Sequence, residues 1–168
     1  MAHEYLYDSP PPTHVLVFDG CTYELGWDGL RSTSPPDSPA MPTLDYATHL
    51  VNIVKFHCGQ MFHLFDEVVF MSNLKHYYAT QSDGIAGREL WYVHFLLILA
   101  FGKAFTARKG QSSEPPGADF FVTALRLLPD TVFLLRDPVS ASEVLCCVAL
   151  YLQCIDFRLM AHSYVRLL

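Results

Sequence analysis

The stretch from Leu90 to Asp130 constrains the fold more than any other part of the chain. Its first half, Trp91 to Phe101, is apolar on every side apart from His94. A helix that is apolar all round lies inside a protein or a membrane. This run is closed by basic residues and is too short for a membrane span. We therefore predict a buried core helix from Leu90 to about Lys109.

The second half of the stretch predicts an amphipathic partner for that helix. After Pro115-Pro116-Gly117, apolar residues recur at helical spacing from Ala118 to Leu128. Asp119, Thr123 and Arg126 fall on the opposite face of this second helix. One fully buried and one amphipathic helix, joined by a Pro/Gly loop, predict the nucleus of an all-α domain.

Further helices are indicated on both sides of this nucleus. Helix starts are expected at Thr43, at Asp66 and at Asp137-Pro138, where capping residue types precede apolar periodic runs. The helix after Asp66 should end at the Ser82-Asp83-Gly84 break, and a last short helix should run from Phe157 to Leu168. Five or six helices joined by short loops favour antiparallel helix pairs.

Residues 1–42 differ in composition from the rest and predict a Pro-rich, largely irregular N-terminal arm. They hold seven of the eleven prolines. His14 to Phe18 is expected to be an extended segment, and Trp27 and Leu30 are expected to anchor the arm on the helices. The domain organisation that we predict is this arm followed by one helical domain over residues 43–168.

Charge and cysteine usage narrow the class of protein. The formal net charge is -6 and no run of Lys and Arg occurs, which disfavours a phosphate-binding surface. The sequence does not begin with basic residues followed by an apolar segment, so we predict no secretory signal. No apolar run reaches transmembrane length. The five cysteines are odd in number, so we expect reduced thiols in an intracellular compartment.

The densest set of polar residues is His57-Cys58 together with His63 and Asp66-Glu67. His63 and Glu67 are four residues apart, so on one helix they would share a face and hold a divalent metal. The alternative is that His63 lies in a turn before Asp66 caps the next helix. No second partner motif accompanies them, and the second interpretation is favoured.

The cysteines and the remaining polar residues are interpreted as structural. Cys147 and Cys154 are seven residues apart, beside Cys146, which predicts one buried stripe of a helix rather than a zinc site. Cys21 lies in a Gly-flanked loop, and nothing in the sequence locates a base beside it. We expect caps or ion pairs at three polar residues, Asp119, Asp156 and Arg158. We expect the aromatic clusters to pack in the core and not to line a ligand pocket; they are Tyr77-Tyr78, Trp91-Tyr92 and Phe120-Phe121.

Three segments together resemble a known family: LWYVHFLLILAFGKAF, PPGADFFVTALRLLPD and LLRDPVSASEVLCCVALYLQCIDFR. They are similar to the middle homology region, or fungal-specific transcription factor domain, of binuclear zinc-cluster transcription factors. The resemblance extends from about Leu44 to His162. It lies in core and loop patterns, not in catalytic motifs.

The resemblance implies an all-helical, non-enzymatic regulatory domain in the nucleus. Such a domain modulates transcription through effector or protein contacts, and zinc and DNA are bound by a separate zinc-cluster domain. The six-cysteine pattern of that cluster does not occur in this sequence. We therefore expect no cofactor and no functional-site residue here, and DNA contact only through such a separate domain. The family's helices continue beyond this pattern, so we expect an incomplete helical domain.

One alternative from another class remains open. The chain would then be a small-molecule-binding or metal-dependent helical enzyme that uses His57, His63 and Glu67. In the regulatory hypothesis, the core is expected to form where the Leu90 and Val144 helices pack against Phe120, Leu125 and Leu128.

Overall fold

The computed structural model describes residues 23, 25–27, 39–80, 90–107 and 114–167. These residues form helices and no strand, which confirms the predicted all-α class. The helices are α1 (Leu44–Cys58), α2 (Glu67–Thr80), α3 (Leu90–Thr106), α4 (Ala118–Leu127), α5 (Thr131–Leu134), α6 (Pro138–Cys154) and α7 (Arg158–Val165).

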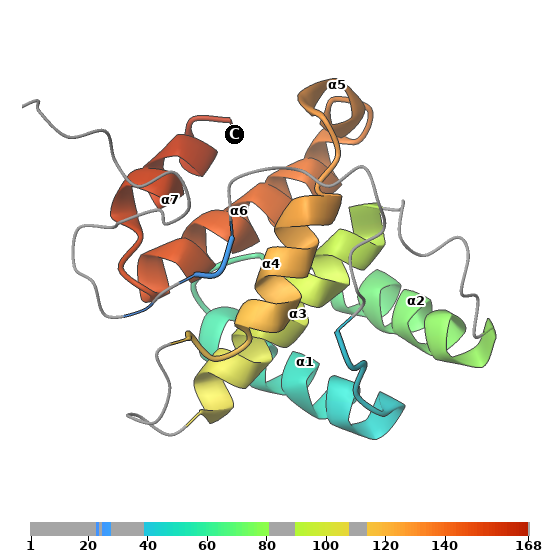
Figure 1. Cartoon of the computed structure of the whole chain (residues 1–168). Helices are drawn as coiled ribbons and strands as arrows, with labels where there is room; N and C mark the ends of the chain where they lie inside the picture. Colours follow the sequence, from blue (N-terminus) through green and yellow to red (C-terminus); the bar gives the residue numbers. More distant parts are fainter. Residues whose placement is uncertain (1–22, 24, 28–38, 81–89, 108–113, 168) are drawn as a thin grey trace, which may run out of the picture.

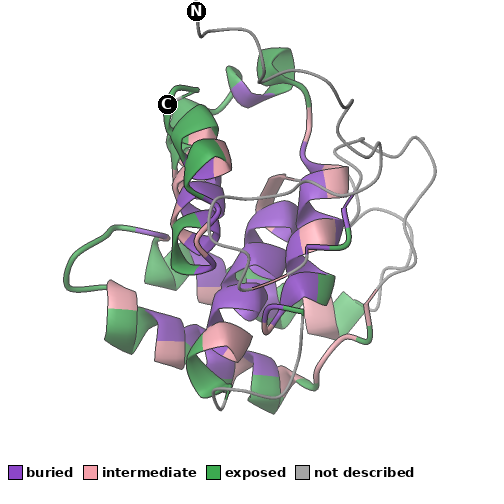
Figure 2. Ribbon diagram, turned by 60° about the vertical axis from the view of Figure 1, so that its left-hand side comes forward, coloured by how far each residue is buried: buried purple, intermediate pink, exposed green. Residues whose placement is uncertain are grey.

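Helix α3 lies at the centre of the fold, as its apolar run predicts. Every residue from Tyr92 to Gly102 is buried, and α1, α4 and α6 pack directly on it (Figure 1). Figure 2 shows the burial as a continuous purple band through the middle of the molecule. The expected core around Phe120, Leu125 and Leu128 is confirmed, since all three side chains are buried.

Two glycines allow neighbouring backbones to approach α3 closely. A Cβ on Gly102 would lie 2.6 Å from the Cβ of Leu50, so α1 and α3 can touch here only without a side chain. Gly117 has φ +81°, and a Cβ there would lie 2.5 Å from the carbonyl oxygen of Ala100. The left-handed region is open to glycine at little cost. Gly117 therefore turns the chain tightly against α3 at the start of α4.

The three predicted helix starts are confirmed. Thr43 is the N-cap of α1, and its hydroxyl accepts from the amide of Tyr46. The carboxylate of Asp66 accepts from the amide of Val69 at 2.9 Å at the start of α2. Asp137 caps α6 in the same way, with Pro138 in the first turn. These side chains satisfy amides that have no partner within their own helices.

Helices α3 and α6 contact each other in the same direction. His94 meets Glu143 and Cys147, and further along α3, Phe101 meets Tyr151. Helix α4, in contrast, begins beside the C-terminal half of α3 and runs back along it (Figure 1). Antiparallel helix pairs were predicted, and α3 and α4 form such a pair, whereas α3 and α6 do not. The parallel pair arises because α4 and α5 carry the chain back before α6 begins.

Helix α7 folds back on α6 through a left-handed turn. Asp156 has φ 66°, and the amide of Phe157 donates to the carbonyl of Leu152 at 2.8 Å. This arrangement closes the C-terminal end of α6. The predicted pairing of Asp156 with Arg158 is confirmed at 2.6 Å.

Some local predictions differ from the structure. Thr123 is buried, not on the polar face, because its hydroxyl donates to the carbonyl of Asp119 and needs no solvent. Cys154 is exposed, so it does not share the buried stripe of Cys147. Helix α5 was not predicted.

The N-terminal arm is described only in part. Trp27 is buried in the core cluster, as expected for an anchor, and Leu25 is buried with it. Where the arm meets α1, the Tyr78 hydroxyl donates to the carbonyl of Pro42 at 2.6 Å. The Leu90 helix, predicted to about Lys109, ends at Thr106. Outside the described residues lie Cys21, Leu30, His14 to Phe18 and the Ser82 to Gly84 break.

Across the described part of the chain, none of the helices combines the length and apolar character that a bilayer span requires.

Candidate functional site

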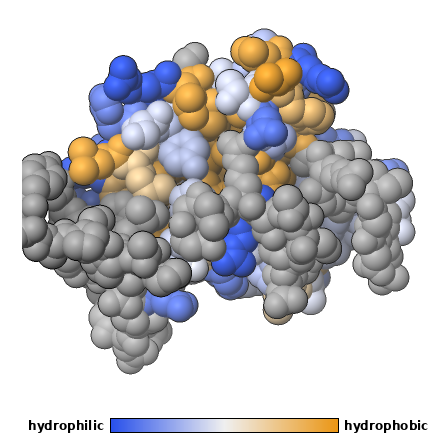
Figure 3. Space-filling view, turned by 45° about the horizontal axis from the view of Figure 1, so that its top comes forward, coloured by the Kyte–Doolittle hydropathy of each residue, from blue (hydrophilic) through white to orange (hydrophobic). Residues whose placement is uncertain are grey.

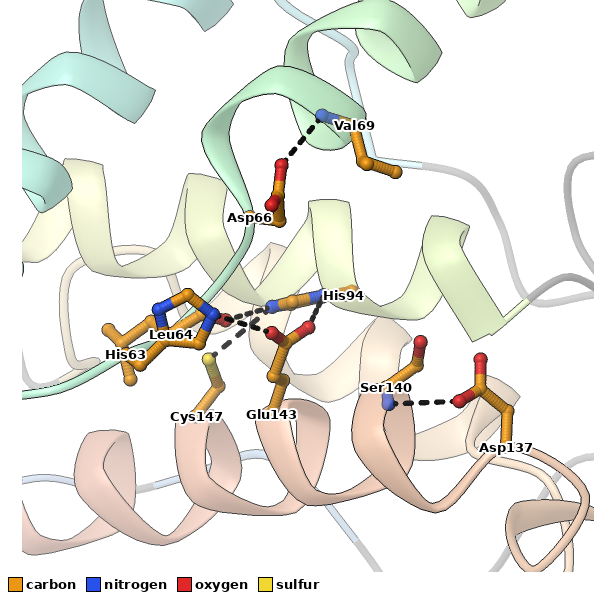
Figure 4. A network of polar contacts seen from close by, with 9 residues as sticks. All are labelled: His63, Leu64, Asp66, Val69, His94, Asp137, Ser140, Glu143 and Cys147. Carbon is orange, nitrogen blue, oxygen red and sulfur yellow. Dashed lines mark hydrogen bonds and ion pairs between the residues drawn. The ribbon is translucent and has the colours of Figure 1, made fainter.

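A small polar network lies between the N-terminal halves of α3 and α6. His94 enters it from α3, Glu143 and Cys147 from α6, and His63 and Leu64 from the segment between α1 and α2 (Figure 4). His94 and Glu143 point toward each other across the two helices. Buried polar groups in an apolar core have a large desolvation cost, so their partners decide their chemistry.

His94 is a neutral hydrogen-bond donor. Its Nε2 lies 2.8 Å from the carbonyl oxygen of Leu64, which can only accept, so Nε2 carries the proton. Burial lowers the pKa of His94 from 6.5 to about 4, and the Leu64 carbonyl opposes this only in part. Nδ1 lies 4.0 Å from the Glu143 carboxylate, and with a neutral ring this contact is not an ion pair.

Glu143 has one direct partner at the surface. Its Oε1 lies 3.3 Å from Nε2 of His63, whose side chain is 75% exposed. Partial burial raises the pKa of Glu143, and the carboxylates of Asp66 and Asp137 raise it further against the effect of His63. Three carboxylates thus share one region of negative potential.

Cys147, His94 and Glu143 resemble a nucleophile, a base and an orienting acid in order, but their geometry favours packing. The thiol Sγ lies 3.8 Å from Nε2 of His94, and that nitrogen already donates to Leu64. Cys147 has no exposed surface, and burial raises the pKa of its thiol well above the usual value. A protonated, enclosed thiol is a poor nucleophile.

A pocket of about 610 Å³ opens beside this network, within the size range of small-molecule sites. It lies between α2, α3 and the segment from α5 into α6. Asp66 and Asp137, the caps of α2 and α6, stand on its rim, while His94 and Glu143 line its inner part. Its other lining residues are Phe65, Val69, Phe70, Asn73, Leu90, Trp91, Phe133, Arg136, Val139 and Ser140.

The pocket walls are aromatic and well supported. Trp91 stacks on Phe95 with ring centroids 5.3 Å apart, and Phe70 tilts against Trp91 at 5.9 Å. Phe65 and Phe70 pack on each other at 4.8 Å. The Trp91 Nε1 is a buried donor without a partner in the described structure. Such a donor costs free energy unless something accepts from it.

The residues of the predicted metal set have separate partners. His57 stacks on Phe105 at 4.7 Å, His63 pairs with Glu143, and Glu67 pairs with Lys55. His63 lies in the segment before α2, as the favoured interpretation predicted. No group of three or more His, Cys, Asp or Glu side chains in the described ranges is arranged to hold a metal ion.

Other predicted roles are filled as expected. Asp119 pairs with Lys103 at 3.0 Å, and the ammonium of Lys103 lies over the ring of Phe120. Phe120 and Phe121 are core residues. Trp91 packs against the core and also lines the pocket, so it fits both the core and the ligand-pocket interpretation of the aromatic clusters.

The sequence did not predict that His94 and Glu143 lie side by side. His94 is the one polar residue in an apolar run, and this was a usable signal that a partner must exist nearby. Nothing local pointed to Glu143, which lies 49 positions further along.

Comparison with known protein families, with curated proteins and with solved structures finds no match for this chain.

Proposed function

We propose that the chain is a non-enzymatic regulatory domain of a fungal transcription factor of the zinc-cluster type. It would act in the nucleus and modulate transcription through protein or effector contacts. One observation supports this most directly: the three segments that carry the resemblance contain α3, α4 and α6, and α4 and α6 both pack on α3 in one core. Segments with a shared origin in one domain are expected to meet in this way.

The roles of the polar side chains favour a regulatory scaffold over a catalyst. Asp66 and Asp137 cap helices, Asp119 and Glu67 form ion pairs, and Cys147 is an enclosed thiol. Each of these groups has a role in the fold, as a cap, an ion-pair partner or a core side chain, which favours a structural role over catalysis.

The surface offers apolar contacts suited to protein partners. Val132, Leu135, Val139 and Leu159 on α5 to α7 are each about 70% exposed or more. Figure 3 shows apolar side chains gathered in patches on the face that includes the upper part of Figure 1. Patches of this kind mark interaction surfaces. The acidic net charge of -6 favours protein partners over nucleic acid.

A reporter assay tests the proposal. The chain is inserted between a heterologous DNA-binding module and an activation module, and an unrelated helical domain of equal length serves as the matched spacer. Restraint of activation should lower reporter output several-fold relative to the spacer. A Phe121→Asp variant, which places a charge in the core, should relieve the restraint. Equal output from chain and spacer would refute the regulatory function.

Metal analysis tests the enzyme hypothesis separately. We expect no stoichiometric zinc or iron in the purified chain, because His57, His63 and Glu67 have different partners. Stoichiometric metal that is lost in His63→Ala would instead support a metal-dependent enzyme.

A further inference from the structure

The pocket beside His94 combines three features that select one kind of ligand. It is about 610 Å³ in volume, its walls are aromatic, and its charge is negative. Asp66, Asp137 and Glu143 carry three negative charges against the single positive charge of Arg136, which gives -2. The guanidinium of Arg136 is also held over the ring of Phe133 at 5.3 Å.

The inner carboxylate is the group best placed to bind a cation. Glu143 is only 15% exposed, and the side chain of its protein partner His63 is 75% exposed. His94, on the other side of Glu143, is neutral and cannot neutralise it. A charged hydrogen bond to a partly buried carboxylate is stronger than one at the surface. Glu143 therefore has unused capacity for a positively charged donor.

The walls favour a cation attached to an apolar body. Phe65, Phe70 and Trp91 line it with aromatic rings, and such rings attract cations and pack against flat apolar groups. A bare metal ion would gain little from these rings. An anion would meet the three carboxylates at close range and be repelled.

We propose that this pocket binds a small organic ammonium compound with an aromatic or aliphatic body, with the ammonium on Glu143 and the body against the aromatic wall that includes Phe65 and Trp91. The site goes beyond the proposed regulatory function and does not depend on it. A free amine is favoured over the basic side chain of a protein partner because the pocket extends inward to His94 and is of small-molecule size.

Calorimetry with the full chain tests the proposal. Phenethylammonium should bind saturably, whereas 3-phenylpropionate, which carries the opposite charge on a similar body, should not. Glu143→Gln keeps the shape of the side chain and removes its charge, so it should weaken phenethylammonium binding about tenfold. Asp119→Asn, a carboxylate change outside the pocket, is the matched control and should bind normally.

Two further variants protect the test against misfolding of Glu143→Gln. Asp66→Asn and Asp137→Asn remove rim charges, and asparagine caps a helix as well as aspartate does. Each should keep the helical circular dichroism spectrum and weaken the ammonium probe several-fold.

Three results would overturn the assignment of an ammonium ligand. They are no saturable binding of phenethylammonium at millimolar concentration, equal binding of the anionic probe, and unchanged affinity in all three carboxylate variants. Tighter binding of an acetylated Phe-Lys amide than of phenethylammonium would assign the pocket to a protein side chain, and the small-molecule assignment would be wrong. None of these outcomes depends on the reporter assay, so the two proposals fail separately.

Discussion

The two ends of α3 are built on different principles. Its closed end, Leu99 to Thr106, lies in the apolar core with Gly117, Phe121 and Tyr151, and its Lys103–Asp119 ion pair lies at the surface. Its open end, Leu90 to Phe95, borders the pocket and contains His94. The closed end is specified by shape, and the open end by a few polar pairs around a space. One buried helix therefore forms part of the structural core at one end and the wall of a pocket at the other.

The largest expected difference between the ends comes from removing an aromatic ring. Phe121 has no exposed surface and stacks on Tyr151 at 4.2 Å, so Phe121→Ala should lower the free energy of unfolding by about 3–5 kcal/mol. Phe133→Ala, at the pocket, should cost less than about 1 kcal/mol because Phe133 is 40% exposed. Urea unfolding measures both, and equal losses would refute the contrast.

Backbone approach at the closed end gives the next largest effect. Gly117→Ala adds a Cβ against Ala100 in a left-handed conformation. The strain and the overpacking together should destabilise the fold by about 3 kcal/mol. The control is Gly26→Ala, where a Cβ would have no neighbour within 4 Å, and it should change the urea midpoint little. A neutral Gly117→Ala would show that α4 can move away from α3.

The burial of His94 predicts a pH dependence that belongs to the open end. Its pKa in the fold, about 4, lies below the unfolded value of 6.5, so the unfolded chain takes up a proton first as pH falls. The stabilisation is complete above pH 6.5 and is lost as pH falls toward 4. Between pH 7 and pH 5 the loss should be about 2 kcal/mol.

His94→Gln isolates this contribution from other titrating groups. Glutamine does not titrate, and it retains a donor for the Leu64 carbonyl. From pH 7 to pH 5, the free energy of unfolding should therefore fall more for the unmodified chain than for the variant. The same slope in both would mean that water reaches His94 and keeps its pKa near 6.5.

The smallest effect is a single hydrogen bond at the closed end. The Tyr151 hydroxyl donates to the carbonyl of Pro116 at 2.7 Å and holds the loop before α4. Tyr151→Phe should cost about 1 kcal/mol, since the carbonyl loses its donor. Tyr46→Phe, at a side chain that is 44% exposed, should be neutral. If both variants are neutral in urea unfolding, the hydroxyl does not hold the loop.

The closed end could be predicted from the sequence because its signals are local. The apolar run of α3 and the Pro-Pro-Gly turn before α4 each predict the structure of their own residues. Helix α5 escaped prediction because four residues give no periodicity. Thr123 was misplaced because a threonine can satisfy its hydroxyl within its own helix and then be buried.

The pocket could not be predicted for the opposite reason. Asp66, His94, Asp137 and Glu143 come from three separate regions of the sequence and meet only after α3 and α6 have packed. The metal hypothesis grouped His63 with Glu67 by spacing, whereas the fold pairs His63 with Glu143. Tertiary packing determines which of these side chains meet, and their spacing along the sequence does not indicate it.

Chemical-shift mapping of backbone amides during titration with phenethylammonium tests the contrast between the two ends most directly. We expect the amide signals of Phe70, Trp91, Glu143 and their neighbours to shift. The amide signals of Phe101, Phe121 and Tyr151 should not change. Shifts centred on the closed end, or none at saturating probe, would contradict this expectation.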